Sequence, residues 1–140
     1  MVDDSEIRIT EVAMEWDGGL AFRARMPDGH EIVLDGEETA PSPVEALLAS
    51  IGGCMAIDVV MILEKMRIPP NRFTLELTAE SMPEPPRYFR KVGMTLVLAG
   101  EGLDPAKVER AVSLSREKYC SVMLTLRPDL EVEIDCRIES

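Results

Sequence analysis

The chain has 140 residues, of which 46% are hydrophobic and 29% charged, and a formal net charge of −11 at pH 7. This length predicts a single domain, residues 1–140, that can bury a core without disulfides or a structural metal. The negative charge and the lack of a Lys/Arg cluster argue against nucleic acid and anionic membranes as partners, and no apolar stretch reaches the roughly 20 residues of a membrane span.

The N-terminal third predicts strands. Its first residues are acidic and lack the basic and apolar regions of a secretory signal, which favours the cytoplasm, where thiols stay reduced. Alternating apolar residues then predict three strands, and a change of phase within the first indicates a bulge. We expect these strands at about 7–16, 20–26 and 32–34, the last two joined by the turn Pro27-Asp28-Gly29.

A capping box predicts the start of a long helix. Ser42 is the expected N-cap, Pro43 the first helical residue, and Glu45 the acceptor for the Ser42 N–H. The helix is expected to run from about Pro43 to Met66. Its residues are apolar nearly all round, which is typical of a buried helix at a domain centre or a subunit interface. The cap explains Glu45 fully, and a supporting role in a site is the alternative.

Cys54 follows two glycines in the middle of this helix. Each glycine inside a helix costs about 1 kcal/mol relative to alanine, so Gly52 and Gly53 predict that another thiol or a substrate approaches this backbone closely. Plain core packing is the alternative for Cys54. Asp58 lies one turn further on. Because an unpaired buried carboxylate is costly, Asp58 either pairs with an arginine or orients a site.

Three further strands are expected in the second half of the chain. Apolar alternation predicts strands at 73–79 and 92–98, separated by the proline-rich loop Met82–Arg87, which is a candidate lid. A last strand at 130–138 turns Cys136 inward, where the thiol is expected to serve only in packing. Strands interrupted by two helices predict an α+β fold.

The second helix is expected to begin at Asp104-Pro105 and to carry one apolar stripe. That stripe contains Val108, Ala111, Val112, Ser115 and Tyr119. Cys120 follows directly, at the expected end of the helix. Its neighbours include Arg116 and Lys118, so either a reactive thiol or an ordinary helix-end residue fits this position.

Two thiols suit the reduction of a peroxide. The attacking cysteine must be a thiolate, and the sulfenic acid that it forms condenses with a second thiol to a disulfide. The bond requires Cα atoms within about 7 Å, and spacing in the sequence leaves open whether Cys54 and Cys120 meet. A zinc site is not expected, because the three cysteines show no C-x-x-C spacing and His30 is the one histidine.

The sequence around both cysteines resembles the motifs of a known family. The segment 42–54, followed by Asp58, is similar to the first cysteine motif of the OsmC/Ohr superfamily, and the segments 103–111 and 117–121 are similar to its second. The resemblance extends from about Met14 to Ile138. It is closest to the YhfA-like branch of OsmC-related proteins.

The resemblance implies an α+β fold with the order β-β-β-α-β-β-α-β, built as an intertwined homodimer with long central helices packed at the interface. It also implies an antioxidant, stress-response enzyme without metal, flavin or haem, which reduces hydroperoxides, organic ones especially. Cys54 would be the peroxidatic residue and Cys120 the resolving one. A Cys54–Cys120 disulfide would be recycled by a dithiol.

Two positions depart from the family pattern. Better-studied members carry a glutamate where this chain has Val44, with Glu45 one residue later, about 100° round the helix. Their thiolate-stabilising arginine lies near the first hairpin, where this chain has Trp16-Asp17-Gly18. Arginines that could supply the charge instead are Arg23, Arg25, Arg87 and Arg90. A ligand-binding or redox-sensing protein without turnover is therefore the alternative function.

Overall fold

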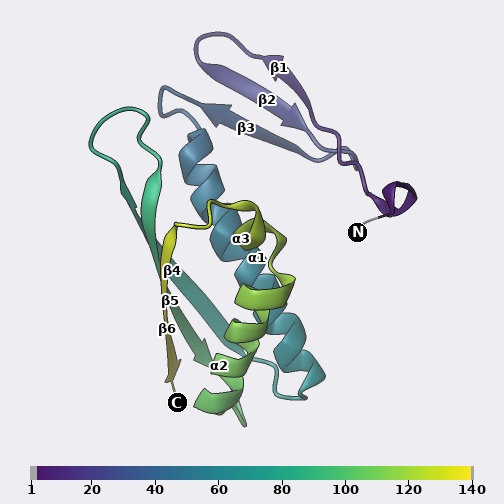
Figure 1. Cartoon of the computed structure of the whole chain (residues 1–140), viewed down its shortest axis with the longest axis vertical. Helices are drawn as coiled ribbons and strands as arrows, with labels where there is room; N and C mark the ends of the chain where they lie inside the picture. Colours follow the sequence, from purple (N-terminus) through teal and green to yellow (C-terminus); the bar gives the residue numbers. More distant parts are fainter. Residues whose placement is uncertain (1–2, 140) are drawn as a thin grey trace. The chain divides into compact units, whose positions relative to one another are not determined.

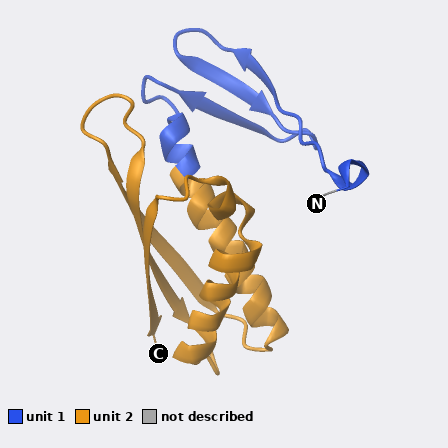
Figure 2. Cartoon of the chain, in the orientation of Figure 1, with its two compact units in different colours: residues 1–47 blue, residues 48–140 orange. Residues whose placement is uncertain are grey.

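The computed structural model describes residues 3–139 and has an α+β fold (Figure 1). The predicted order β-β-β-α-β-β-α-β is confirmed, with short helical additions near the N-terminus and after the second helix. The chain divides into two compact units, residues 1–47 and residues 48–140 (Figure 2). The boundary falls within the first long helix, so each unit is described by itself.

The first unit is an antiparallel sheet with the order β1-β2-β3. Its elements are a 3-10 turn η1 (Asp4–Glu6) and the strands β1 (Ala13–Trp16), β2 (Ala21–Arg25) and β3 (Glu31–Asp35). The prediction that the first strand begins near residue 7 is wrong. β2 ends at Arg25, which pairs with Ala13, so residues 7–12 have no strand beside them.

One face of the β1–β3 sheet is apolar. The cross-strand register places Met14, Trp16, Phe22, Ala24, Ile32 and Leu34 on this face. Ala24 is buried, but the large side chains of Met14, Trp16, Phe22 and Ile32 are exposed. Burying such a surface would be favourable, at roughly 25 cal/mol per Å².

The long helix α1 (Pro43–Lys65) begins as predicted. The Ser42 N–H donates to Glu45 Oε1 at 2.9 Å, and the Glu45 N–H donates to Ser42 Oγ at 3.1 Å, which confirms the capping box. Burial within this chain covers one side of α1 only, so the domain-centre alternative is wrong and the subunit-interface alternative stays a prediction. One stripe is buried, whereas Ile57 and Met61 are 63% and 52% exposed.

By length and composition, α1 is also apolar enough to cross a membrane. The prediction that no stretch reaches this length is therefore wrong. Core helices meet the same criterion, and α1 contributes Ile51, Met55, Val59 and Leu63 to the hydrophobic core. These residues recur every four positions, which places them on one side of the helix.

The second unit packs helices on one face of a mixed sheet (Figure 1). The sheet has the order β4-β5-β6, with β5 antiparallel to β4 and parallel to β6. Its strands are β4 (Arg72–Ser81), β5 (Phe89–Ala99) and β6 (Glu131–Glu139). The parallel pair needs a crossover, which the second helical region supplies. Side chains of this sheet, of α1 and of the second helical region form the hydrophobic core.

The second helical region has three pieces, which corrects the prediction of one helix ending at Tyr119. They are α2 (Pro105–Leu114), a π-helical turn η2 (Ser115–Tyr119) and α3 (Ser121–Thr125). Asp104 caps α2 as its sequence predicts, accepting the Ala106 N–H at 2.9 Å. Cys120 lies between η2 and α3.

Candidate thiol site

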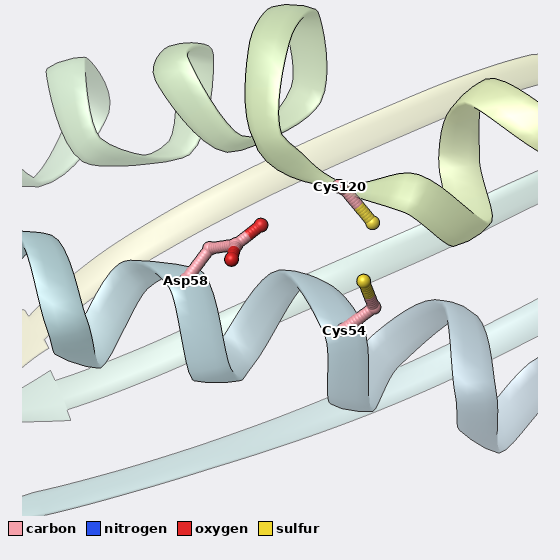
Figure 3. A group of neighbouring side chains, drawn as sticks. All are labelled: Cys54, Asp58 and Cys120. Atoms are coloured by element: carbon pink, nitrogen blue, oxygen red, sulfur yellow. The ribbon is translucent and has the colours of Figure 1, made fainter. Parts of the chain in front are cut away.

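Cys54, Asp58 and Cys120 come together in the second unit (Figure 3). Cys54 and Asp58 lie on neighbouring turns of α1, and Cys120 lies opposite them, between η2 and α3. Both Sγ atoms and a carboxylate oxygen of Asp58 lie within 4.8 Å of one another, and both thiols are free. A disulfide bond of about 2.05 Å therefore requires a movement of no more than about 3 Å between the sulfurs.

The π-helical turn brings Cys120 into the core. The Cys120 N–H donates to the Ser115 carbonyl at 2.8 Å, a bond that spans five residues in place of four. This extra residue shifts the phase of the apolar stripe. Tyr119, predicted to be buried, is 58% exposed, and Cys120 is fully buried in its place. The residue that the sequence puts outside the stripe is thus the one that faces α1.

Ser115 is a site residue that sequence reasoning identified only as part of the apolar stripe. Its hydroxyl is fully buried and donates to Asp58 Oδ2 at 2.8 Å. The hydrogen bond joins the turn before Cys120 to the turn after Cys54. A serine among the buried residues of a stripe needs a polar partner, and Asp58 on the facing helix is the residue that supplies it.

Cys120 is held as a protonated thiol. Burial raises the pKa of Cys120 from its ordinary value of 9.0 to about 11, and a hydrogen bond with Cys54 acts in the same direction. The Met123 N–H donates to Cys120 Sγ at 3.4 Å, which opposes part of this rise. At neutral pH Cys120 is therefore a thiol. The two cysteines also differ in burial, because Cys54 is only partly buried.

The contacts of the two glycines before Cys54 differ from those that the sequence predicts. A Cβ atom at Gly52 would lie 2.7 Å from Leu77 Cδ1, so Gly52 lets β4 pack closely on α1. Nothing lies within 4 Å of the corresponding position at Gly53. The expectation that a thiol approaches the glycine backbone is therefore wrong. The cysteine pair meets through its side chains (Figure 3).

The predicted supporting residues are Asp58, Glu45 and Arg87, and each has a partner of its own. Asp58 lies with the two thiols, and its partner is Ser115. Glu45 is engaged in the helix cap, and the hydrogen bonds from Ser42 lower the pKa of its carboxyl group. Arg87 donates from Nε to the Pro83 carbonyl at 3.3 Å, within its own loop.

No Lys, Arg or His within residues 48–139 forms a hydrogen bond or ion pair with Cys54, Asp58 or Cys120. The arginine pairing that the sequence left open for Asp58 is therefore not formed within this unit. Ser115 donates a hydrogen bond to the carboxylate instead. The third thiol lies on the inward side of its strand, as predicted. Cys136 is partly buried on β6, packs against the core and has a pKa raised by burial.

Comparisons with known proteins agree on one family. The family model described as OsmC-like protein matches residues 36–135, which include both motifs. Protein YhfA of Escherichia coli (strain K12) is 41% identical over 124 residues, covering 87% of this chain and 92% of that protein.

Solved structures show the same fold. A hypothetical protein from Aquifex aeolicus VF5 is 29% identical, with a TM-score of 0.87 over 95% of this chain and 98% of that one. The organic hydroperoxide resistance protein OhrB of Bacillus subtilis is 19% identical, with a TM-score of 0.59 over 94% of this chain and 98% of its own. At that identity the likeness to OhrB concerns the fold alone.

Proposed function

Because the chain belongs to the OsmC-like family, we propose that it is a thiol-dependent peroxidase that reduces hydroperoxides, organic ones in particular. The observation that carries this proposal is the meeting of Cys54 and Cys120, whose sulfurs lie within 4.8 Å. The B. subtilis protein with the same fold is an organic hydroperoxide resistance protein, and the proposed substrate class follows its name.

In the proposed cycle Cys54 attacks and Cys120 resolves. The Cys54 thiolate attacks one peroxide oxygen, the O–O bond breaks, and the departing oxygen takes a proton to leave as an alcohol. Cys54 is then a sulfenic acid. The Cys120 sulfur attacks it and water leaves, which gives the Cys54–Cys120 disulfide. A dithiol reductant returns both residues to thiols by exchange.

The division of roles follows from burial and charge. A thiol with a pKa of about 11 is a poor nucleophile at neutral pH, and Cys120 is fully enclosed. Cys54 is partly exposed on α1 and can be reached by a substrate. Asp58 and Ser115 act as positioning residues, because their hydrogen bond ties α1 to the turn that presents Cys120.

We place this chemistry in a cytoplasmic homodimer. Two apolar surfaces support the dimer, the exposed face of the β1–β3 sheet and the exposed side chains Ile57 and Met61 of α1. A second copy would also offer a source for the cation that residues 48–139 do not provide to Cys54. The cytoplasm suits the cycle, because dithiol reductants keep thiols reduced there.

The test is to map the disulfide that one oxidising equivalent produces. The reduced protein is treated with one equivalent of cumene hydroperoxide and analysed by peptide mass spectrometry. We expect a bridge between Cys54 and Cys120, with Cys136 free, and recycling by a dithiol. Cys136→Ser is the matched control and should form the same bridge. A bridge through Cys136, or no bridge while peroxide is consumed, would contradict the proposed cycle.

The second candidate is a redox sensor without turnover. It is favoured by the lack of a hydrogen bond or ion pair between Cys54 and any Lys, Arg or His within residues 48–139, and by the raised pKa of Cys120. A sensor and a peroxidase form the same disulfide, so the mapping is followed by steady-state peroxide consumption with a dithiol. Repeated turnover identifies the peroxidase. One oxidation per chain without regeneration identifies the sensor.

A further inference from the structure

The same cluster offers three donors of the kind that bind a thiophilic metal ion. Its two sulfurs and one carboxylate oxygen lie within 4.8 Å of one another. In tetrahedral zinc sites Zn–S is about 2.3 Å and Zn–O about 2.0–2.2 Å, so donors on one ion are separated by roughly 3.5–3.8 Å. The donors of Cys54, Asp58 and Cys120 are thus already near the spacing that a single ion requires.

The surroundings support these donors as a metal site would require. Ser115 donates to Asp58 Oδ2 and leaves the other carboxylate oxygen available, and the Met123 N–H donates to Cys120 Sγ. Hydrogen bonds of this kind orient metal ligands and tune their basicity. Both come from backbone and side chains that are fixed by the π-helical turn and by α3.

Charge favours a cation at the same place. No Lys, Arg or His within residues 48–139 pairs with the Asp58 carboxylate, although the carboxylate is partly buried. Before an ion binds, the Asp58 carboxylate supplies the negative charge of the cluster, and ionisation of the two thiols on binding would bring the total to three negative charges. A divalent cation would neutralise most of that charge, whereas a peroxide would not.

We propose that the reduced Cys54–Asp58–Cys120 cluster binds a tetrahedral, thiophilic divalent cation of the Zn²⁺ class, with water in the fourth position. On binding, both thiols become thiolates and two protons leave to solvent, so the cluster and the ion together carry one negative charge. The sequence predicts no such site, because its cysteines lack zinc-finger spacing. The fold assembles the site from the middle of α1 and a break in the second helical region.

A consequence for the reaction rests on the proposed function. The metal and the disulfide use the same electron pairs on sulfur, so they exclude each other. One hydroperoxide and two protons would convert the metal-bound thiolates to the disulfide, releasing an alcohol, water and the free cation. The bound ion would therefore protect the reduced pair and slow its oxidation, and oxidation would release the ion.

The test uses the full chain, reduced and stripped of metal, titrated with Zn²⁺ against a chromophoric chelator. We expect one ion per chain, release of about two protons per ion, and no binding by the disulfide form. Co²⁺ as a spectroscopic probe should give thiolate-to-metal absorption. Cys54→Ser and Cys120→Ser should each weaken binding by more than the about 10–100-fold that loss of an outer-shell partner causes, and Ser115→Ala should fall within that range.

Matched variants keep the proposal open to contradiction. Asp58→Asn should weaken binding and Cys136→Ser should leave it unchanged, with thermal unfolding used to show that each variant is folded. Unchanged affinity in Cys120→Ser, loss of binding in Cys136→Ser, or binding only at millimolar Zn²⁺ would overturn the site. Disulfide formation in the presence of a chelator separates the two proposals. A protein that forms the disulfide but binds no Zn²⁺ loses the metal site alone, and one that binds Zn²⁺ but resists peroxide loses the peroxidase alone.

Discussion

Cys54 and Cys120 face each other from two different kinds of backbone. Cys54 lies in the regular part of α1 and is partly exposed, whereas Cys120 lies between a π-helical turn and α3 and is fully buried. The regular helix leaves the Cys54 thiol partly exposed. The irregular segment carries the other to it and closes it off from water.

The difference supports the two roles proposed for this pair of identical side chains. Burial raises the pKa of Cys120 to about 11 and keeps it protonated, although the Met123 N–H partly opposes this. In the proposed cycle, a protonated Cys120 would not compete with Cys54 for the peroxide. Cys120 would attack the Cys54 sulfenic acid once that acid forms beside it, since the attack is then within one site.

The largest expected effect is on peroxide consumption, and it should separate the two thiols. Cys54→Ser should reduce the rate by at least about 10³-fold, because a hydroxyl is not appreciably ionised at neutral pH. Cys120→Ser should keep the first oxidation fast but lose recycling, and Cys54 should proceed to sulfinic acid. Rapid-mix peroxide assays and intact-mass measurements follow both. Equal loss of the first oxidation in the two variants would contradict the division of roles.

The next effect is on alkylation, and its direction follows from the raised pKa of Cys120. A thiol with a pKa of about 11 has roughly 100-fold less thiolate at pH 7 than one with a pKa of 9.0, so Cys120 should react with iodoacetamide much more slowly than an unfolded cysteine. Its rate should rise about tenfold per pH unit up to about pH 11. Peptide mass spectrometry after timed quenching measures this profile. A plateau below pH 9 would contradict it.

The same shift predicts alkaline destabilisation. Because the pKa of Cys120 is higher in the folded protein than in the unfolded chain, the protonated thiol favours folding fully below pH 9.0, and this contribution falls as the pH rises toward about 11. Denaturant unfolding of the reduced protein at pH 8, 9.5 and 11 tests this. Cys120→Ala, which removes the titrating group, should flatten this part of the pH dependence.

A smaller effect is expected when the link between the two regions is cut. Ser115→Ala removes the donor to Asp58 and leaves the carboxylate without that partner, which should lower the free energy of unfolding by about 1–3 kcal/mol. Disulfide formation should also slow, since the turn before Cys120 is no longer tied to α1. Ser113→Ala, an exposed position on α2, is the matched control and should change little. Equal effects of the two variants would remove Ser115 as a positioning residue.

The sequence predicts the regular side of this comparison better than the irregular side. The capping box depends on local hydrogen bonds between Ser42 and Glu45, which are three residues apart. The strand alternation depends on a period of two. Both can therefore be predicted from the order of residue types. The π-helical turn cannot be predicted in this way, because the extra residue within its hydrogen-bonded turn leaves no mark on the types of residue present. Tyr119, which the sequence places on the apolar stripe, is therefore exposed, and Cys120 is buried in its place.

The departure at the glycines has a similar origin. The sequence indicates that a neighbouring group approaches the helix at Gly52 and Gly53. It does not identify that neighbour. Here the neighbour is a side chain of the sheet and the thiols meet elsewhere. Asp58 was open between two interpretations for the same reason, since its partner, Ser115, lies on another helix.

The smallest expected effect concerns the two glycines and tests whether the sheet, not the thiol, sets their identity. Gly53→Ala meets nothing within 4 Å and should raise the free energy of unfolding by up to about 1 kcal/mol through helix propensity. Gly52→Ala gains the same propensity but places its Cβ 2.7 Å from Leu77 Cδ1, so the core must shift, at a cost of about 1–3 kcal/mol. Denaturant unfolding should therefore rank Gly53→Ala above Gly52→Ala. The reverse order would mean that a surface beyond this chain, such as a second copy, packs against Gly53 and makes that glycine the more constrained of the two.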